Sequence, residues 1–107
     1  QPSVIKCRGH LQWVRQRYDC AVIKAEAAEH YPCWGGIETH HVRTRGAGGG
    51  DEQVVPLCTG HHALLDSPAW SSTRFEREFK IDMRAMAEEL WCISPHGIKW
   101  RITCRDG

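Results

Sequence analysis

Residues 37–66 read IETHHVRTRGAGGGDEQVVPLCTGHHALLD and hold four of the seven histidines of this 107-residue chain. The first doublet, His40-His41, lies in a segment of strand-like composition, where neighbouring side chains point to opposite faces. The second doublet, His61-His62, opens a stretch with helical spacing. Imidazole is the commonest metal ligand and titrates near neutral pH. The stretch therefore predicts a metal-binding hairpin and helix in which the two histidines of a doublet do different work.

The composition fits one small domain with a modest hydrophobic core. Chains of this size often depend on a metal or on disulfides for stability. The six cysteines are irregularly spaced, and Cys58 and His61 form a Cys-x2-His pair, which favours zinc in a reducing compartment. No apolar run approaches the length of a membrane span. We therefore expect a soluble, cytoplasmic, zinc-binding protein with no membrane partner.

The net charge of +1 indicates no global attraction to nucleic acid. Local basic clusters are still present. Arg43 and Arg45 flank the glycine-rich segment, and Arg15 and Arg17 close the first helical stretch.

The pattern of apolar residues predicts an α+β fold. Residues 21–30 are rich in helix formers but are equally compatible with a compact loop. The alternation of Ile98, Trp100, Ile102 and Cys104 predicts a terminal strand over 97–104. The remaining expected elements are a helix over 10–17, strands over 37–43 and 53–57, a helix capped by Thr59 and ending near Asp66, a helix over 72–79, and a helix from the N-cap Asp82 to Trp91.

Residues 20–66, with their HH…PLCxxHH signature, resemble an HNH endonuclease of the ββα-metal group, and small phage and prophage HNH proteins in particular. The resemblance implies a hairpin and a helix around a metal, with flanking helices and a zinc knuckle. It also implies a single domain over 1–107. Its core would span 20–66, followed by a helical extension over 67–91 and the terminal strand.

By this resemblance His40 is the first ligand of a catalytic metal and His41 the general base, while His62 and Asp66 are the ligands from the helix. The spacing of His62 and Asp66 is physically sensible, because residues four apart share one helical face. The aspartate favours a hard ion, Mg²⁺ or Mn²⁺, with Ni²⁺ or Zn²⁺ as alternatives.

The activity implied is hydrolysis of DNA phosphodiester bonds with one divalent metal, leaving 5′-phosphate and 3′-hydroxyl ends. Neutral His41 would take a proton from the attacking water, and we expect a backbone carbonyl to hold its other ring nitrogen. Arg43 or Arg45 would bind the flanking phosphates of the DNA. The resemblance also implies the cytoplasm of a bacterial host, with a larger phage or recombination protein as a candidate partner.

The chain contains no asparagine, so the middle position of the family's motif must be filled by another residue. Gln53 and Asp51 are the two candidates by position. Gln53 can keep the orienting role of the amide and is the predicted catalytic residue. Asp51 is the better candidate for bracing the loop or for supporting a residue of the site.

Cys58 and His61 resemble half of the zinc knuckle found in many HNH proteins, and Cys33 is in place for the other half. Cys20 or His30 can complete the set. We favour Cys20, because thiolates bind zinc more strongly and Cys3His sets are common.

Two further interpretations remain open. A second zinc can join the two ends of the chain, although free or buried thiols are the simpler interpretation. Its candidate ligands are Cys7, His10, Cys92, His96 and Cys104. The chain can also be a non-catalytic, zinc-stabilised nucleic-acid-binding module, although such a module would not need His41 beside His40. Glu38 can be a partner of a metal ligand, but an exposed strand carboxylate is the favoured interpretation.

Overall fold

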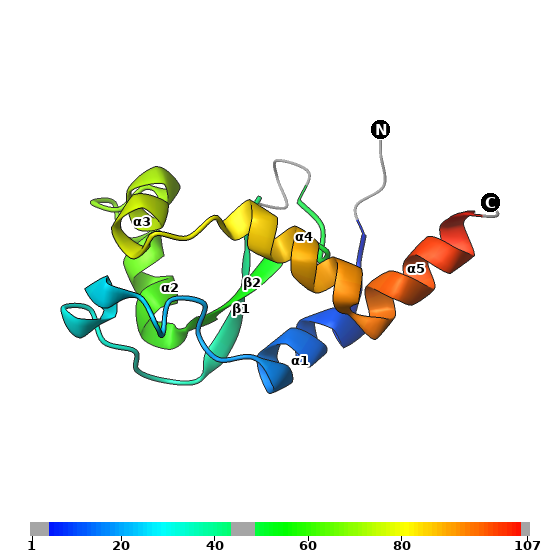
Figure 1. Cartoon of the computed structure of the whole chain (residues 1–107), viewed down its shortest axis with the longest axis horizontal. Helices are drawn as coiled ribbons and strands as arrows, with labels where there is room; N and C mark the ends of the chain where they lie inside the picture. The colour runs from blue at the N-terminus through cyan, green and yellow to red at the C-terminus, as the bar shows by residue number, and fades with distance from the viewer. Residues whose placement is uncertain (1–4, 44–48, 106–107) are drawn as a thin grey trace.

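The computed structural model describes residues 5–43 and 49–105, the last three as backbone only. It shows a small α+β domain, elongated along one axis, with α3 at one end and α5 at the other (Figure 1). The elements in chain order are α1 (Arg8–Arg17), the 3-10 helix η1 (Glu26–Glu29), β1 (Ile37–His41), β2 (Val54–Cys58), α2 (Thr59–Asp66), α3 (Ser72–Phe79), α4 (Met83–Ile93) and α5 (Pro95–Arg105).

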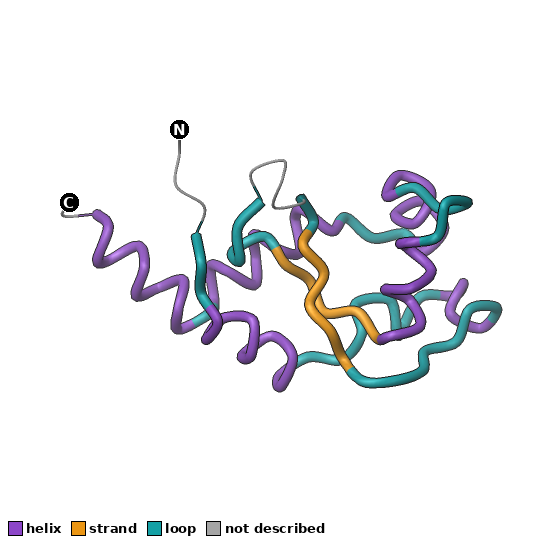
Figure 2. The backbone as a smooth tube through the Cα atoms, turned by 180° about the vertical axis from the view of Figure 1, so that it is seen from behind, coloured by secondary structure: helices purple, strands orange, loops and turns teal. Residues whose placement is uncertain are grey.

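Strands β1 and β2 form an antiparallel pair in the middle of the molecule (Figure 2). The register runs from Ile37 opposite Cys58 to His41 opposite Val54. Both predicted strands are confirmed with slightly different bounds, because the pair begins and ends within one or two residues of the expected positions. Residues 44–48 of the glycine-rich connection, including Arg45, lie outside the described residues.

The two faces of the sheet pack against different helices. Val55 and Leu57 join a cluster with Leu65 of α2 and Phe75 of α3. Val54, on the other face, packs in a second cluster with side chains of α1 and α4. Since His40 lies opposite Val55 and His41 opposite Val54, the two histidines of the first doublet face different helices, as predicted.

The predicted helices α2, α3 and α4 are confirmed, and each begins at a side-chain cap. Ser71 and Asp82 accept hydrogen bonds from the N–H groups of Arg74 and Ala85. The cap of α2 is Cys58, whose Sγ accepts from the N–H of His61. Thr59 is therefore not the cap, because its hydroxyl is used in contacts with Gly36 and Glu38 instead.

The predicted terminal strand over 97–104 is wrong, because these residues belong to α5. Among the described residues the sheet contains only β1 and β2. Ser94 instead caps a helix, with its hydroxyl accepting from the N–H of His96 at 3.2 Å, and Pro95 takes the first helical position that proline favours. Gly97 lies so close to Trp91 of α4 that a Cβ would fall 1.8 Å from the Trp91 carbonyl oxygen, which holds α5 tightly to the end of α4.

His10 is fully buried where α1, α4 and α5 meet. Its Nδ1 lies 2.9 Å from the Ser94 hydroxyl, and its ring packs on Trp13 and Trp91. Burial, aided by the nearby His96 and opposed by Asp51, lowers the pKa of His10 to about 4. The ring is therefore neutral in the folded protein at neutral pH.

Acidification should destabilise the protein partly through His10. An unfolded chain binds a proton at this residue below about pH 6.5, whereas the folded protein binds it only near pH 4. Stability is therefore lost as the pH falls between these values, by about 2 kcal/mol from pH 7 to pH 5. Urea unfolding at both pH values measures the loss. The variant His10→Leu should show a smaller difference between the two pH values than the wild type, and an equal difference would contradict this assignment.

Candidate functional site

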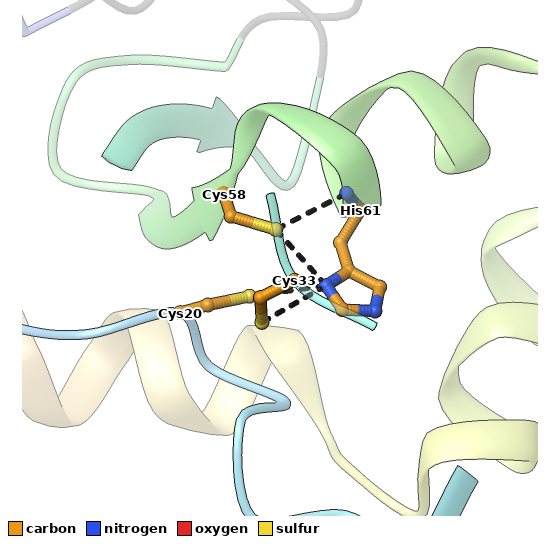
Figure 3. A group of neighbouring side chains, drawn as sticks. All are labelled: Cys20, Cys33, Cys58 and His61. Carbon is orange, nitrogen blue, oxygen red and sulfur yellow. Dashed lines mark hydrogen bonds between the residues drawn. The ribbon is translucent and has the colours of Figure 1, made fainter. Parts of the chain in front are cut away.

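Cys20, Cys33, Cys58 and His61 come together, with one ligand atom of each within 4.8 Å of the others. Figure 3 shows the three thiols around the imidazole of His61. His61 Nδ1 lies 3.1 Å from Cys58 Sγ and 3.5 Å from both Cys20 Sγ and Cys33 Sγ. The predicted Cys3His set is therefore assembled.

These distances fit a tetrahedral metal site. Zinc bonds of about 2.3 Å to sulfur and about 2.0 Å to nitrogen place a ligand nitrogen about 3.5 Å from each ligand sulfur. The separations between His61 Nδ1 and the three sulfurs are at or just below that value. The Cys3His cluster can therefore hold a metal ion such as zinc.

Four segments supply this cluster. Cys58 ends β2 and His61 lies in the first turn of α2, so the cap that starts the helix also sets the spacing between these two side chains. Cys20 follows α1, and Cys33 follows η1. The residues between the two cysteines fold into turns and η1, so the compact-loop interpretation of 21–30 is closer than the helical one. His30 is exposed and takes no part in the set.

The hydrogen bonds around the cluster prepare His61 and Cys58 for metal binding. His61 Nε2 donates to the carbonyl oxygen of Tyr31 at 2.6 Å, which leaves the lone pair on Nδ1 facing the sulfurs. Burial lowers the pKa of His61 and keeps the ring neutral. Burial also raises the pKa of Cys58, but the N–H groups of His61 and Trp34 outweigh it, so this pKa lies below its usual value.

Desolvation is the largest influence on the pKa values of the other two thiols. It raises the pKa of Cys20, and it raises that of Cys33 to about 12 with the help of the neighbouring Cys20. These two thiols therefore need a positive ion to favour their ionised form.

A second group of polar side chains lies between β1 and α2. The rings of His40 and His62 meet edge to face with centroids 5.3 Å apart. His40 Nε2 is buried and makes no hydrogen bond within the described part of the chain. Burial, followed by His62, lowers the pKa of His40 to about 4, while the nearby Asp66 acts in the opposite direction. The structure thus brings the predicted ligands His40, His62 and Asp66 into one neighbourhood, with a neutral His40.

Glu38 belongs to this group as well. Its Oε1 accepts from His62 Nδ1 at 2.7 Å, and its Oε2 accepts from the Thr59 hydroxyl at 2.9 Å. The hydrogen bond from His62, then that from Thr59, holds the pKa of Glu38 below its usual value. Glu38 is thus a bonded partner of His62 and not merely an exposed carboxylate. Its place two residues before His40, on the same strand face, was the available signal.

His41 faces away from this group and contacts Asp51, with Nε2 2.9 Å from Oδ1. Asp51 is 2% exposed, and its Oδ2 accepts from the N–H of Cys7. The partner of His41 is therefore a carboxylate and not the expected backbone carbonyl. Asp51 therefore supports His41 and the chain before α1, in agreement with a supporting role in the site.

The other predicted site residues lie elsewhere. Gln53 and Arg43 line a cavity of about 300 Å³ beside α4, together with Glu52 and Trp91, and neither His40 nor His41 lines it. Within residues 5–43 and 49–105, no second group of three metal-ligating side chains is as close as the Cys3His cluster. The ligands proposed for a second zinc are therefore not assembled there, and the side chain of Cys104 lies outside the described residues.

Comparison with known proteins identifies no relative of this chain. No protein-family model matches the chain, and no curated protein or solved structure is significantly similar to it. Among the described residues, no helix has both the length and the apolar character needed to span a bilayer.

Proposed function

We propose that this protein is a zinc-stabilised, metal-dependent endonuclease of the HNH type that hydrolyses DNA phosphodiester bonds. The observation that carries the proposal is the division of the first histidine doublet. His40, with an unpartnered Nε2 among the described residues, lies beside His62, while His41 is held separately by Asp51. One histidine is thus prepared for a metal and its neighbour for proton transfer.

His40, His62 and Asp66 would hold the catalytic divalent ion, Mg²⁺ or Mn²⁺. The low pKa of His40 keeps its ring in the neutral form that binds metals. Glu38 accepts from His62 Nδ1, so the lone pair of neutral His62 is on Nε2. When bound, the ion polarises the scissile phosphate and stabilises the leaving oxygen.

His41 acts as the general base through Nδ1. Asp51 accepts a hydrogen bond from Nε2, which fixes the tautomer and leaves Nδ1 unprotonated. Nδ1 can then take the proton of the attacking water, and the Asp51 carboxylate stabilises the imidazolium that forms. Asp51 is therefore a positioning residue. Gln53 and Arg43 lie next to this strand end and, with Arg45, would orient the loop and the DNA backbone.

The second candidate function is binding of nucleic acid without cleavage. Asp51 also accepts from the N–H of Cys7, so its contact with His41 can serve the fold alone. His40, His62 and Asp66 also do not come as close together as the Cys3His set. These two observations favour a zinc-stabilised binding module.

The test of the proposal is nicking of supercoiled plasmid by the zinc-loaded protein. Mg²⁺ or Mn²⁺ is added to one series of reactions and left out of the other, and the ends are mapped by ligation. Cleavage only with added metal, leaving 5′-phosphate and 3′-hydroxyl ends, supports the endonuclease. If the protein slows the migration of DNA in a gel but does not cleave it with either metal, the result supports the binding module instead.

Glu38 provides a sharper test of the metal site. Replacing Glu38 with Ala removes the acceptor of His62 Nδ1, and loss of such a partner costs 10–100-fold in metal affinity. Glu38→Gln keeps an acceptor oxygen and should retain most of the affinity. The readout is the concentration of Mn²⁺ that gives half-maximal nicking. Equal shifts in both variants would contradict the role of Glu38 as the acceptor that orients His62.

A further inference from the structure

The charges of this chain are strongly segregated despite its net charge of +1. Residues 5–17 and 95–105 hold seven of the fourteen Lys and Arg residues and none of the 13 Asp and Glu residues. The rest of the chain therefore carries a net charge of −6. These two segments, 5–17 and 95–105, thus account for all of the excess positive charge.

These two segments lie together in space. Helices α1 and α5 are in contact near the end of α4 (Figure 1). Gly9 of α1 lies against His96 of α5, where a Cβ would fall 2.4 Å from the imidazole. The close approach places the starts of the two basic helices side by side.

The described basic side chains of these segments face solvent. On α1, Arg8 and Arg15 are seven residues apart and share a face, opposite the buried His10 and Val14. We call the exposed basic side chains of the two segments the terminal-helix surface. It consists of Lys6, Arg8, Arg15, Arg17, Lys99 and Arg101.

The buried side of α1 packs on the face of the sheet that carries His41. Val14 of α1 packs on Val54, which lies directly opposite His41 in the register. Because Arg8 and Arg15 lie on the face of α1 opposite Val14, a polyanion bound to them would lie on the outer side of α1. Neither of the two residues predicted to bind DNA belongs to this surface. They are Arg43 and Arg45.

We propose that the terminal-helix surface binds the phosphate backbone of DNA. The choice of DNA as the polyanion rests on the proposed function, whereas the location of the surface rests only on charge and packing. Lys and Arg that neutralise phosphates release counterions, so such binding is independent of base sequence and weakens steeply with salt. The surface would hold the substrate while the hairpin acts on it.

An anionic membrane is the other polyanion to consider, because Ile98, Trp100 and Ile102 of α5 are exposed at 43%, 41% and 64%. A helix that lies in a bilayer interface separates an apolar face from a basic one. In α5 the basic Lys99 and Arg101 alternate with these apolar residues, so the helix has no clear division of faces. The charge pattern, which extends over α1, favours DNA.

The experiment compares two triple variants that remove the same charge. Arg8→Gln, Arg15→Gln and Lys99→Gln alter the surface. Lys24→Gln, Arg77→Gln and Lys80→Gln alter exposed residues around one cavity beside α3, and α3 lies at the opposite end of the molecule from α5 (Figure 1). Binding of the zinc-loaded proteins to a labelled DNA duplex is measured by anisotropy over a series of NaCl concentrations, without Mg²⁺ or Mn²⁺. Zinc content and thermal unfolding verify that both variants fold.

The surface variant should show a plot of log Kd against log salt that is shallower by about 2 to 3, since each phosphate contact contributes about 0.9. The control variant should keep the wild-type slope. Equal loss of slope in both variants would overturn the proposal, since net charge alone would then explain binding. If the surface variant kept the wild-type slope for DNA but no longer bound phosphatidylserine vesicles, the proposal would be wrong and the surface would be a membrane-binding one. This experiment measures binding and not cleavage. A protein that binds DNA through this surface but does not cut it would therefore contradict only the proposed nuclease activity.

Discussion

Replacing Cys58 with Ser should remove the metal and abolish cooperative folding. The wild-type protein is expected to contain one zinc per chain. Structural zinc contributes about 10–16 kcal/mol of binding free energy in small zinc-dependent domains, which equals or exceeds the total stability of most domains. Elemental analysis gives the zinc content, and thermal unfolding followed by circular dichroism gives the stability.

The large effect follows from what the cluster joins. The four ligands tie the end of β2 and the start of α2 to the segments after α1 and after η1. In those segments the regular structure is limited to short turns and a 3-10 helix of four residues. Without the metal, three buried or clustered thiols and an imidazole would be left with little to hold them in place.

Cys92→Ser is the matched control for this experiment. Cys92 is an exposed free cysteine in α4 and lies outside the cluster, so its replacement should change neither zinc content nor unfolding temperature. If Cys58→Ser kept its zinc and its unfolding temperature, the structural role of the cluster would be wrong.

The second large effect is expected for His41→Ala in the plasmid assay. Loss of a general base typically costs 10²- to 10⁴-fold in rate. Binding of DNA without added metal should be nearly unchanged, because the proposed contacts with the backbone come from arginines and lysines. The initial rate of nicking at saturating Mn²⁺ is the measurement.

Removing His41 also leaves the buried Asp51 without one of its partners, so a fall in stability must be separated from a fall in rate. His41→Gln keeps a side chain that can donate to Asp51 but has no titratable nitrogen. Both variants should be equally inactive, whereas His41→Gln should be the more stable. His30→Ala, at an exposed histidine outside both groups, should cut like the wild type. Nicking that survives both changes at His41 would exclude this histidine as the base.

The central part of the fold was predictable because its signals are local. The alternation around His40 and His41, the turn-forming glycines and the helical spacing after Cys58 each act within a few residues. Cys20 was also identified correctly, since the chemistry of zinc favours a third thiolate over an imidazole. The conformation of the residues between Cys20 and Cys33 could not be predicted, because Ala and Glu fit both a helix and a single helical turn.

The sequence placed Glu38 and Asp51 near the site but did not assign each carboxylate to its histidine, because that pairing depends on tertiary contacts. Asp51 is ten residues from His41 and Glu38 is 24 residues from His62. Only the register of the hairpin and the placement of α2 decide which carboxylate each ring contacts. The strand predicted over 97–104 failed for a related reason. Alternation over so few residues forms a strand only where a partner is available, and Ser94-Pro95 already starts a helix.

The first turn of α2 carries a member of the Cys3His cluster and, in the next position, a proposed ligand of the catalytic ion. His61 belongs to the Cys3His cluster, and the next residue, His62, is bonded to Glu38, which also accepts from Thr59. An ion bound at one group orders this turn and so reduces the conformational entropy that is lost when an ion binds at the other group. Thermodynamic linkage makes such an effect reciprocal, so zinc should tighten Mn²⁺ binding by the same factor by which Mn²⁺ tightens zinc binding.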